Sequence, residues 1–129
     1  MGYAPRILVV DDEPSVLLLL EQVLSDVGYY VTVAANGRLA LAQVRSREFD
    51  VVIIDLSLPD RDGIEVLRQI RSEHSYTPIL ALSGFMVGDM PQIARAAGAT
   101  DTLQKPASPE TLLLKVYELI EPRGTWVGK

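Results

Sequence analysis

Five short runs of aliphatic and β-branched residues alternate along this chain with five longer segments. The runs span residues 6–10, 31–35, 49–55, 79–83 and 102–104. Continuous apolar runs of this length are typical of strands that are buried on both faces of a parallel sheet. An alternation of such strands with helices predicts an α/β fold, with a five-stranded parallel sheet and helices on both of its faces. Sites in such sheets form outside the carboxyl ends of the strands.

The segments between the predicted strands carry helix start and stop signals. Pro14 suits the first turn of a helix, and Gly28 lies where that helix should end. Near the carboxyl end of the chain, Ser108 and Pro109 form a predicted cap and first turn. The predicted helices span residues 14–27, 38–47, 63–73, 89–97 and 109–121.

The residue counts exclude several classes of function. A length of 129 residues fits one domain. The chain has no cysteine, which excludes a disulfide scaffold, a zinc-thiolate site and a cysteine nucleophile. Its single histidine, His74, excludes a metal site built from several histidines. We expect His74 to be a solvated loop residue that is not phosphorylated.

Charge and hydropathy limit the partners and the location that we expect. The formal net charge is −5 and no basic run occurs, so direct nucleic-acid binding and binding to an anionic membrane are not expected. The densest apolar run, residues 16–20, is far shorter than the roughly 20 residues that span a bilayer. Aspartates occur before a signal-peptide core can form, and the absence of cysteine fits the cytosol, so the predicted location is cytoplasmic.

Polar side chains follow four of the predicted strands. Asp11 and Asp12 end the first strand, and Asp55 ends the third. If these strands are neighbours, three carboxylates converge and repel one another, and a divalent cation relieves the repulsion. Ligands that are all oxygen favour Mg2+ (or Mn2+). Ser83 ends the fourth strand and Lys105 the fifth, where a hydroxyl and an ammonium can bind an anionic oxygen.

Each of these residues, taken singly, also fits a plain role as a solvated turn residue or a surface lysine. The combination is more specific, and it resembles the receiver domain of response regulators in two-component (phosphorelay) systems. The resemblance covers residues 6–121. Its motifs are Val9-Val10-Asp11-Asp12-Glu13-Pro14, Asp55-Leu56-Ser57-Leu58-Pro59-Asp60-Arg61-Asp62-Gly63, Ala81-Leu82-Ser83-Gly84 and Lys105-Pro106.

The resemblance implies a fold and a division of the chain. It implies the flavodoxin-like order 2-1-3-4-5 for the five strands, for which a receiver domain is itself a standard example. Residues 1–122 are then the receiver domain. Residues 123–129 are interpreted as a C-terminal tail or the start of a linker.

The resemblance also implies a role for each matching residue. Asp55 is the expected phosphoacceptor for a phosphohistidine on a histidine kinase or histidine phosphotransfer protein. Ser83 and Lys105 are expected to bind the phosphoryl group. The expected metal ligands are Asp11, Asp12, Asp55 and the backbone carbonyl of Ser57. Phosphorylation should switch the conformation and control an output domain or protein, with no independent substrate turned over.

Two positions bear on how such a switch works. The family usually has Tyr or Phe three residues before the lysine, where this chain has Thr102. Either the conformational change is transmitted through other groups, or the output differs from that of the family, unless Thr102 is simply a good strand residue. Ser57 and Phe85 occupy positions that, in the family, tune the rate at which the acyl phosphate is hydrolysed. The Phe85 ring either screens the acyl phosphate from water or packs away from the site.

The first and last helices carry more leucine than one buried face needs. In the first helix, Leu17, Leu20, Leu24 and Val27 are predicted to form the buried stripe. Leu18 and Leu19 then face solvent and can dock a kinase or phosphotransfer helix. Leucines 112–114 of the last helix can serve a homodimer or an output partner.

Three other functions remain as alternatives. A receiver-like module can bind a partner constitutively without phosphate, but it would be expected to lack one of the pocket residues. An Mg2+-dependent aspartyl phosphatase would need a second acid two residues after the nucleophile, where Ser57 stands. A flavin or nucleotide module would need a glycine-rich loop after the first strand, where residues 11–13 would instead repel phosphate.

Overall fold

The computed structural model describes residues 3–121, and these form a five-stranded sheet in which every pairing is parallel. The spatial order is β2-β1-β3-β4-β5, which confirms the order implied by the resemblance. The strands are β1 (Arg6–Val10), β2 (Tyr30–Ala34), β3 (Val51–Asp55), β4 (Ile79–Ser83) and β5 (Asp101–Gln104). β1 and β3 are neighbours, so their carboxyl ends lie side by side.

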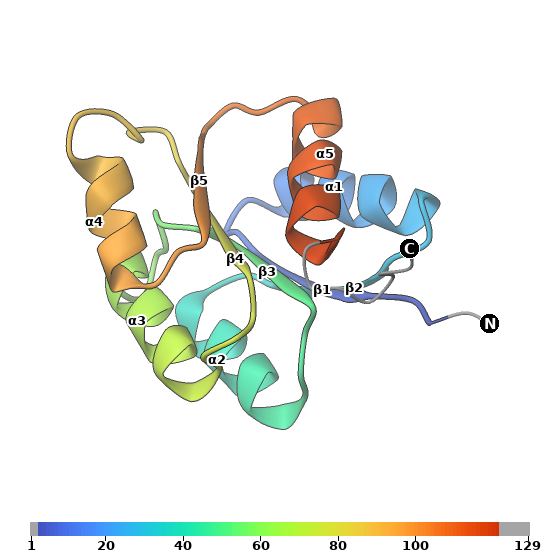
Figure 1. Cartoon of the computed structure of the whole chain (residues 1–129), viewed down its shortest axis with the longest axis horizontal. Helices are drawn as coiled ribbons and strands as arrows, with labels where there is room; N and C mark the ends of the chain where they lie inside the picture. Colours follow the sequence, from blue (N-terminus) through green and yellow to red (C-terminus); the bar gives the residue numbers. More distant parts are fainter. Residues whose placement is uncertain (1–2, 122–129) are drawn as a thin grey trace.

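Five helices cover the sheet, with α1 and α5 on one face and α2, α3 and α4 on the other (Figure 1). Three of them begin at a side-chain cap, from Asn36, Asp62 and Ser108, each of which accepts a backbone N–H of the first turn. The helices are α1 (Pro14–Asp26), α2 (Gly37–Ser46), α3 (Gly63–Glu73), α4 (Met90–Ala97) and α5 (Pro109–Ile120).

Alternate side chains of the central strands supply two separate cores. In β1, Leu8 and Val10 pack towards α2, α3 and α4, whereas Ile7 and Val9 pack towards α1 and α5. All five residues of β3 are buried, because helices cover both sides of this central strand. The rigid central strands therefore fix the positions of the residues that follow them.

The structure corrects several details of the sequence interpretation. β3 begins at Val51 and not at residue 49. Val27 is the C-cap of α1 and is 55% exposed, so the predicted buried stripe ends at Leu24. His74 is half-buried as the C-cap of α3, and its Nε2 lies 2.6 Å from the carbonyl oxygen of Val44. The interpretation of His74 as a solvated loop residue was therefore wrong.

Two expectations concern membranes and the end of the chain. Within residues 3–121, no helix is both long and apolar enough to cross a bilayer. The predicted tail or linker, residues 123–129, lies outside the described residues.

Candidate functional site

Three carboxylates meet at the carboxyl edge of the sheet. Asp11 directly follows β1, and Asp55 is the last residue of β3. Asp11, Asp12 and Asp55 each place one oxygen within 4.8 Å of the others. Asp11 and Asp55 are 1% and 4% exposed, whereas Asp12 is exposed. The predicted convergence of these three residues is confirmed.

Lys105 lies between the two buried carboxylates. Its Nζ is 2.9 Å from Asp55 Oδ2 and 3.1 Å from Asp11 Oδ2. Burial alone lowers the pKa of Lys105, but its hydrogen bonds to Asp55 and Asp11 outweigh burial and leave the pKa above its ordinary value. The ammonium is therefore charged at neutral pH. One cation faces three carboxylates, so the site keeps a net negative charge.

Backbone N–H groups fix how the two buried carboxylates are oriented. The N–H of Ser57 donates to Asp55 Oδ1 over 3.0 Å, and the N–H of Glu13 donates to Asp11 Oδ1 over 3.0 Å. Each carboxylate therefore uses one oxygen for the backbone and the other for Lys105. Every oxygen keeps a second lone pair, which remains available to a cation or an incoming phosphorus atom.

The loop after β3 is anchored to a neighbouring helix by a residue to which the sequence interpretation gave no role. Asp60 accepts the N–H groups of Gly37 and Arg38 at the start of α2, over 2.9 and 3.0 Å. The Gly37 N–H is the main cause that lowers the pKa of Asp60. A helix N-terminus favours such an anion. The sequence gives little signal for this contact because residues 37 and 60 are distant in the chain.

Ser83 ends β4 beside the carboxylates and is 5% exposed. Its Oγ accepts the N–H of Phe85 over 2.9 Å, which leaves the hydroxyl proton to donate elsewhere. The Phe85 side chain is 77% exposed, so it does not pack into the core. Thr102, at the position of the missing aromatic residue, lies on β5 and is half-buried.

The donor set fits a small divalent cation. Three carboxylate oxygens from two adjacent strand ends are close enough to share one ion, and oxygen ligands with room for water suit Mg2+. The single ammonium of Lys105 leaves excess negative charge for the ion to neutralise. That the carbonyl of Ser57 joins these ligands stays a prediction.

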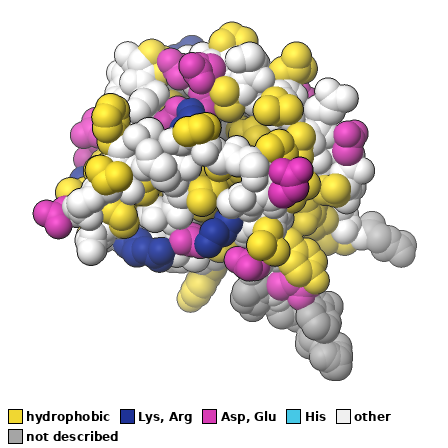
Figure 2. All heavy atoms as spheres, turned by 90° about the horizontal axis from the view of Figure 1, so that it is seen from above, with side chains coloured by type: hydrophobic (Ala, Val, Ile, Leu, Met, Phe, Trp, Pro, Cys, Tyr) yellow, Lys and Arg dark blue, Asp and Glu magenta, His cyan; other side chains and the backbone are white. Residues whose placement is uncertain are grey.

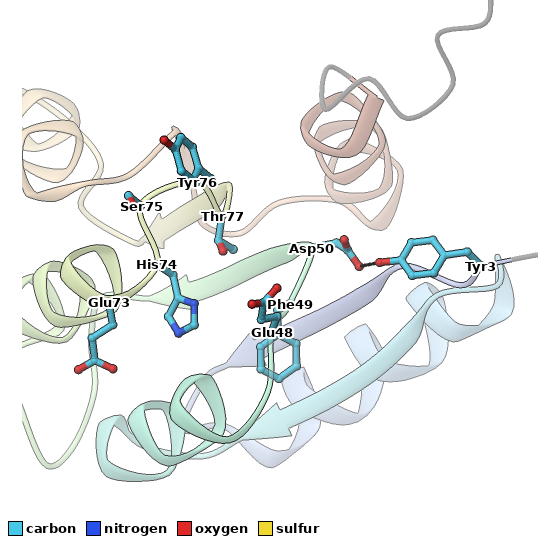
Figure 3. Close-up of a pocket in the computed structure, with 9 residues that line it drawn as sticks. All are labelled: Tyr3, Glu48, Phe49, Asp50, Glu73, His74, Ser75, Tyr76 and Thr77. Atoms are coloured by element: carbon cyan, nitrogen blue, oxygen red, sulfur yellow. Dashed lines mark hydrogen bonds between the residues drawn. The ribbon is translucent and has the colours of Figure 1, made fainter.

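A separate pocket of about 430 Å³ lies before the amino ends of β3 and β4 (Figure 3). Its acidic residues include Glu73, which pairs with Arg45 at 2.9 Å, and Asp50, which accepts the hydroxyl of Tyr3. This pocket lies at the edge of the sheet away from Asp55. It brings together no combination of nucleophile, cation and metal ligands like the one around Lys105.

Comparisons with known proteins agree with this geometry. The family model for the response regulator receiver domain matches residues 7–117. The probable transcriptional regulatory protein TcrX of Mycobacterium tuberculosis is 34% identical over 95% of this chain and 53% of its own length. The structure of the chemotaxis response regulator CheY4 of Vibrio cholerae has a TM-score of 0.86 and 38% identity, covering 91% of this chain and 99% of CheY4.

A CheY-like receiver domain protein of Methanospirillum hungatei has a TM-score of 0.90 at 29% identity, over 94% of this chain and 97% of that protein. This chain belongs to the response regulator receiver domain family of two-component signalling systems. The fold is that of a receiver domain, which is a phosphoacceptor signalling domain. The chain spans about a quarter to a half of the length of the first curated relatives that it matches.

Replacing Lys105 with methionine is expected to strengthen Mg2+ binding by at least about tenfold. The substitution removes a positive charge that contacts two of the expected metal ligands and would repel a cation bound to them. A single and a double positive charge about 4 Å apart repel by about 2 kcal/mol even in a water-like dielectric. Isothermal titration with Mg2+ measures the change. The matched control is Lys115→Met, because Lys115 pairs with Asp101 at 2.8 Å, outside the site. Unchanged or weaker Mg2+ binding in Lys105→Met would contradict the expected arrangement.

Proposed function

We propose that Asp55 accepts a phosphoryl group from a phosphohistidine on a histidine kinase or histidine phosphotransfer protein. A carboxylate oxygen of Asp55 attacks phosphorus, the phosphorus–nitrogen bond breaks, and its electron pair returns to the imidazole of the donor. Asp55 becomes an acyl phosphate. The observation that supports this most is the Asp55 carboxylate itself, which is buried, held by the Ser57 N–H and bonded to Lys105 Nζ.

The surrounding residues can stabilise the transferring group. Lys105 offers an ammonium that exchanges its bond with the carboxylate for one with a phosphoryl oxygen, and the Ser83 hydroxyl can donate to another. Asp11, Asp12, Asp55 and the Ser57 carbonyl are the proposed ligands of Mg2+ or Mn2+. When bound, the ion would neutralise charge on the phosphoryl oxygens.

The phosphoryl group would act as a ligand that shifts a conformational equilibrium. Its bonds to Ser83 and Lys105 favour the loop arrangement in which both residues reach it. To shift the ratio of the two conformations from about 1:99 to about 99:1, the phosphoryl group must favour one conformation over the other by about 5.5 kcal/mol. Because Thr102 replaces the usual aromatic residue, we propose that the switch reaches an output domain or protein through other groups.

Exposed apolar side chains support a docking role for α1 and α5. Leu18 and Leu19 on α1 and Leu114 and Tyr117 on α5 are exposed, and these two helices pack against each other. Hydrophobic side chains lie among acidic and basic ones on the face shown in Figure 2. We propose α1 as the docking helix for the phosphodonor, and α5 as a surface for an output partner or a homodimer.

Catalysis by this chain is proposed to be limited to its own phosphorylation and dephosphorylation, in the cytoplasm. The alternative is an interaction module that works without phosphorylation. Thr102 is the observation that favours it, because the usual coupling of a hydroxyl to an aromatic ring cannot operate with threonine at this position. None of the five expected pocket residues is missing from the sequence, and the three carboxylates lie beside Lys105, which supports the phosphoacceptor function.

Incubation of the intact chain with acetyl phosphate and Mg2+ tests the proposed function. We expect a mass increase of one phosphoryl group, its absence when a chelator replaces Mg2+, and its removal by hydroxylamine, which cleaves acyl phosphates. Beryllofluoride binding in the presence of Mg2+ provides an independent check. Failure of both modification and beryllofluoride binding would refute the proposal and favour the phosphate-independent module.

Replacing Phe85 with alanine is expected to shorten the lifetime of the acyl phosphate by about threefold to tenfold. The exposed Phe85 ring follows Ser83 by two residues and can restrict the approach of water, which alanine cannot do. Loss of the phosphoryl mass over time measures the lifetime. Val87→Ala is the matched control, since Val87 is also exposed in the same loop. An equal or longer lifetime in Phe85→Ala would show that the ring does not screen the site.

A further inference from the structure

The side chain of Gln104 joins the two segments that carry the phosphoryl-binding residues. Gln104 is the last residue of β5 and pairs with Ser83 in the register between β4 and β5. Its Oε1 accepts the N–H of Met86 over 2.8 Å. Its Nε2 donates to the carbonyl oxygens of Gly84 over 2.7 Å and Lys105 over 3.1 Å. The side-chain amide of Gln104 thus contacts the backbone of the loop that follows Ser83 and the backbone of Lys105.

The loop between β4 and α4 is anchored to the hydrophobic core by Met86, which is 8% exposed, and has few other buried contacts. Phe85 and Val87 are exposed, and a methyl group at Gly84 would meet nothing within 4 Å. Among the described residues, one backbone bond, from the Lys105 N–H to the Ser83 carbonyl oxygen, also connects the end of β4 to Lys105. A segment with so few buried contacts opens easily unless hydrogen bonds hold it. Gln104 supplies the side-chain hydrogen bonds that join this loop to β5.

Gln104 lies on the same side of β5 as Thr102, because side chains two residues apart share a face of a strand. We propose that Gln104 is a positioning residue, which holds Ser83 and Lys105 at the separation at which both bind one phosphoryl group. This inference rests on the proposed function of Asp55. The hydrogen bonds of the Gln104 side chain organise the loop after β4. This loop borders β5, which carries threonine in place of the usual aromatic residue.

The chemistry of the amide explains why glutamine suits this position. It supplies both the acceptor that Met86 needs and the donors that Gly84 and Lys105 need. Methionine has a similar length and shape but can make none of these bonds as a donor and is a poor acceptor. Loss of one or two net hydrogen bonds corresponds to a factor of about 5–30 in an equilibrium constant. We therefore expect Gln104→Met to bind beryllofluoride about 5- to 30-fold more weakly than the wild type.

Mg2+ binding distinguishes positioning from a general loss of structure. Gln104 has no hydrogen bond to Asp11, Asp12 or Asp55, so the affinity for Mg2+ alone should change by less than about twofold. Isothermal titration measures Mg2+, and fluorine NMR measures beryllofluoride at saturating Mg2+. Gln22→Met is the matched control, since Gln22 is exposed on α1, and it should change neither affinity.

A double-mutant cycle tests whether Gln104 acts through Ser83. In a Ser83→Ala background, Gln104→Met should lose a substantial part of its effect on beryllofluoride affinity, because one of the two positioned groups is already missing. Selective weakening of beryllofluoride binding together with this non-additivity would support the inference. Unchanged beryllofluoride binding in Gln104→Met, an equal loss of Mg2+ binding, or full additivity would overturn it. Absence of beryllofluoride binding in the wild type would instead overturn the proposed function and this inference with it.

Discussion

Asp55→Asn is expected to abolish acyl-phosphate formation, reducing the phosphorylated fraction by at least about a hundredfold. The carboxamide of asparagine is a poor nucleophile and cannot form the acyl phosphate that defines the modified chain. The side chain keeps nearly the same shape, so the Ser57 N–H retains an oxygen acceptor. Intact-mass measurement after incubation with acetyl phosphate and Mg2+ quantifies the phosphorylated fraction.

The same substitution should leave the fold intact. Lys105 keeps its bond to Asp11, and one of three mutually repelling carboxylates is removed. The control is Asp60→Asn, in the same loop, which retains one acceptor for the start of α2 and should still be phosphorylated. Phosphorylation of Asp55→Asn to the wild-type level, with the folded state confirmed by circular dichroism, would show that another residue is the acceptor.

The sequence predicts the sheet well because buried parallel strands leave a distinct pattern. Runs such as residues 79–83 are apolar up to their last residue, Ser83, and β4 has the same bounds in the structure. Their strand-end residues could be predicted to converge because the carboxyl ends of neighbouring parallel strands share one edge. The order that makes β1 and β3 neighbours required the family resemblance, since the spacing of strands along a chain does not specify which of them pair.

The details that the sequence interpretation missed depend on contacts between distant segments. Val27 has the spacing of a buried residue, but the helix ends at Asp26 and Val27 points to solvent as a C-cap. His74 was expected in solvent, yet it meets the carbonyl of Val44 on another helix. In the sequence, Gln104 is indistinguishable from an ordinary polar residue at the end of a strand. Its role became visible only through the positions of Gly84 and Met86 across the loop.

Gly63→Ala is expected to lower the free energy of unfolding by about 2–4 kcal/mol. A Cβ atom at this position would lie 2.1 Å from the carbonyl oxygen of Leu56 and 2.6 Å from its carbonyl carbon and Cα. These atoms belong to the backbone, so no side-chain rotation can relieve the overlap. The loop after β3 or the start of α3 must move, and both are held by hydrogen bonds such as that from Ile64 N–H to Asp62.

The displacement should reach the site because Leu56 directly follows Asp55. The Leu56 N–H also donates to the carbonyl of Leu82 in β4, so a shift of Leu56 disturbs the alignment of Asp55 with the end of that strand. We expect phosphorylation of Gly63→Ala by acetyl phosphate to slow as well, measured at a temperature where the variant remains folded. Urea unfolding gives the stability change. Gly84→Ala is the control, since its added methyl group meets nothing within 4 Å, and a cost in Gly63→Ala no larger than in this control would show that the close contact is relieved without strain.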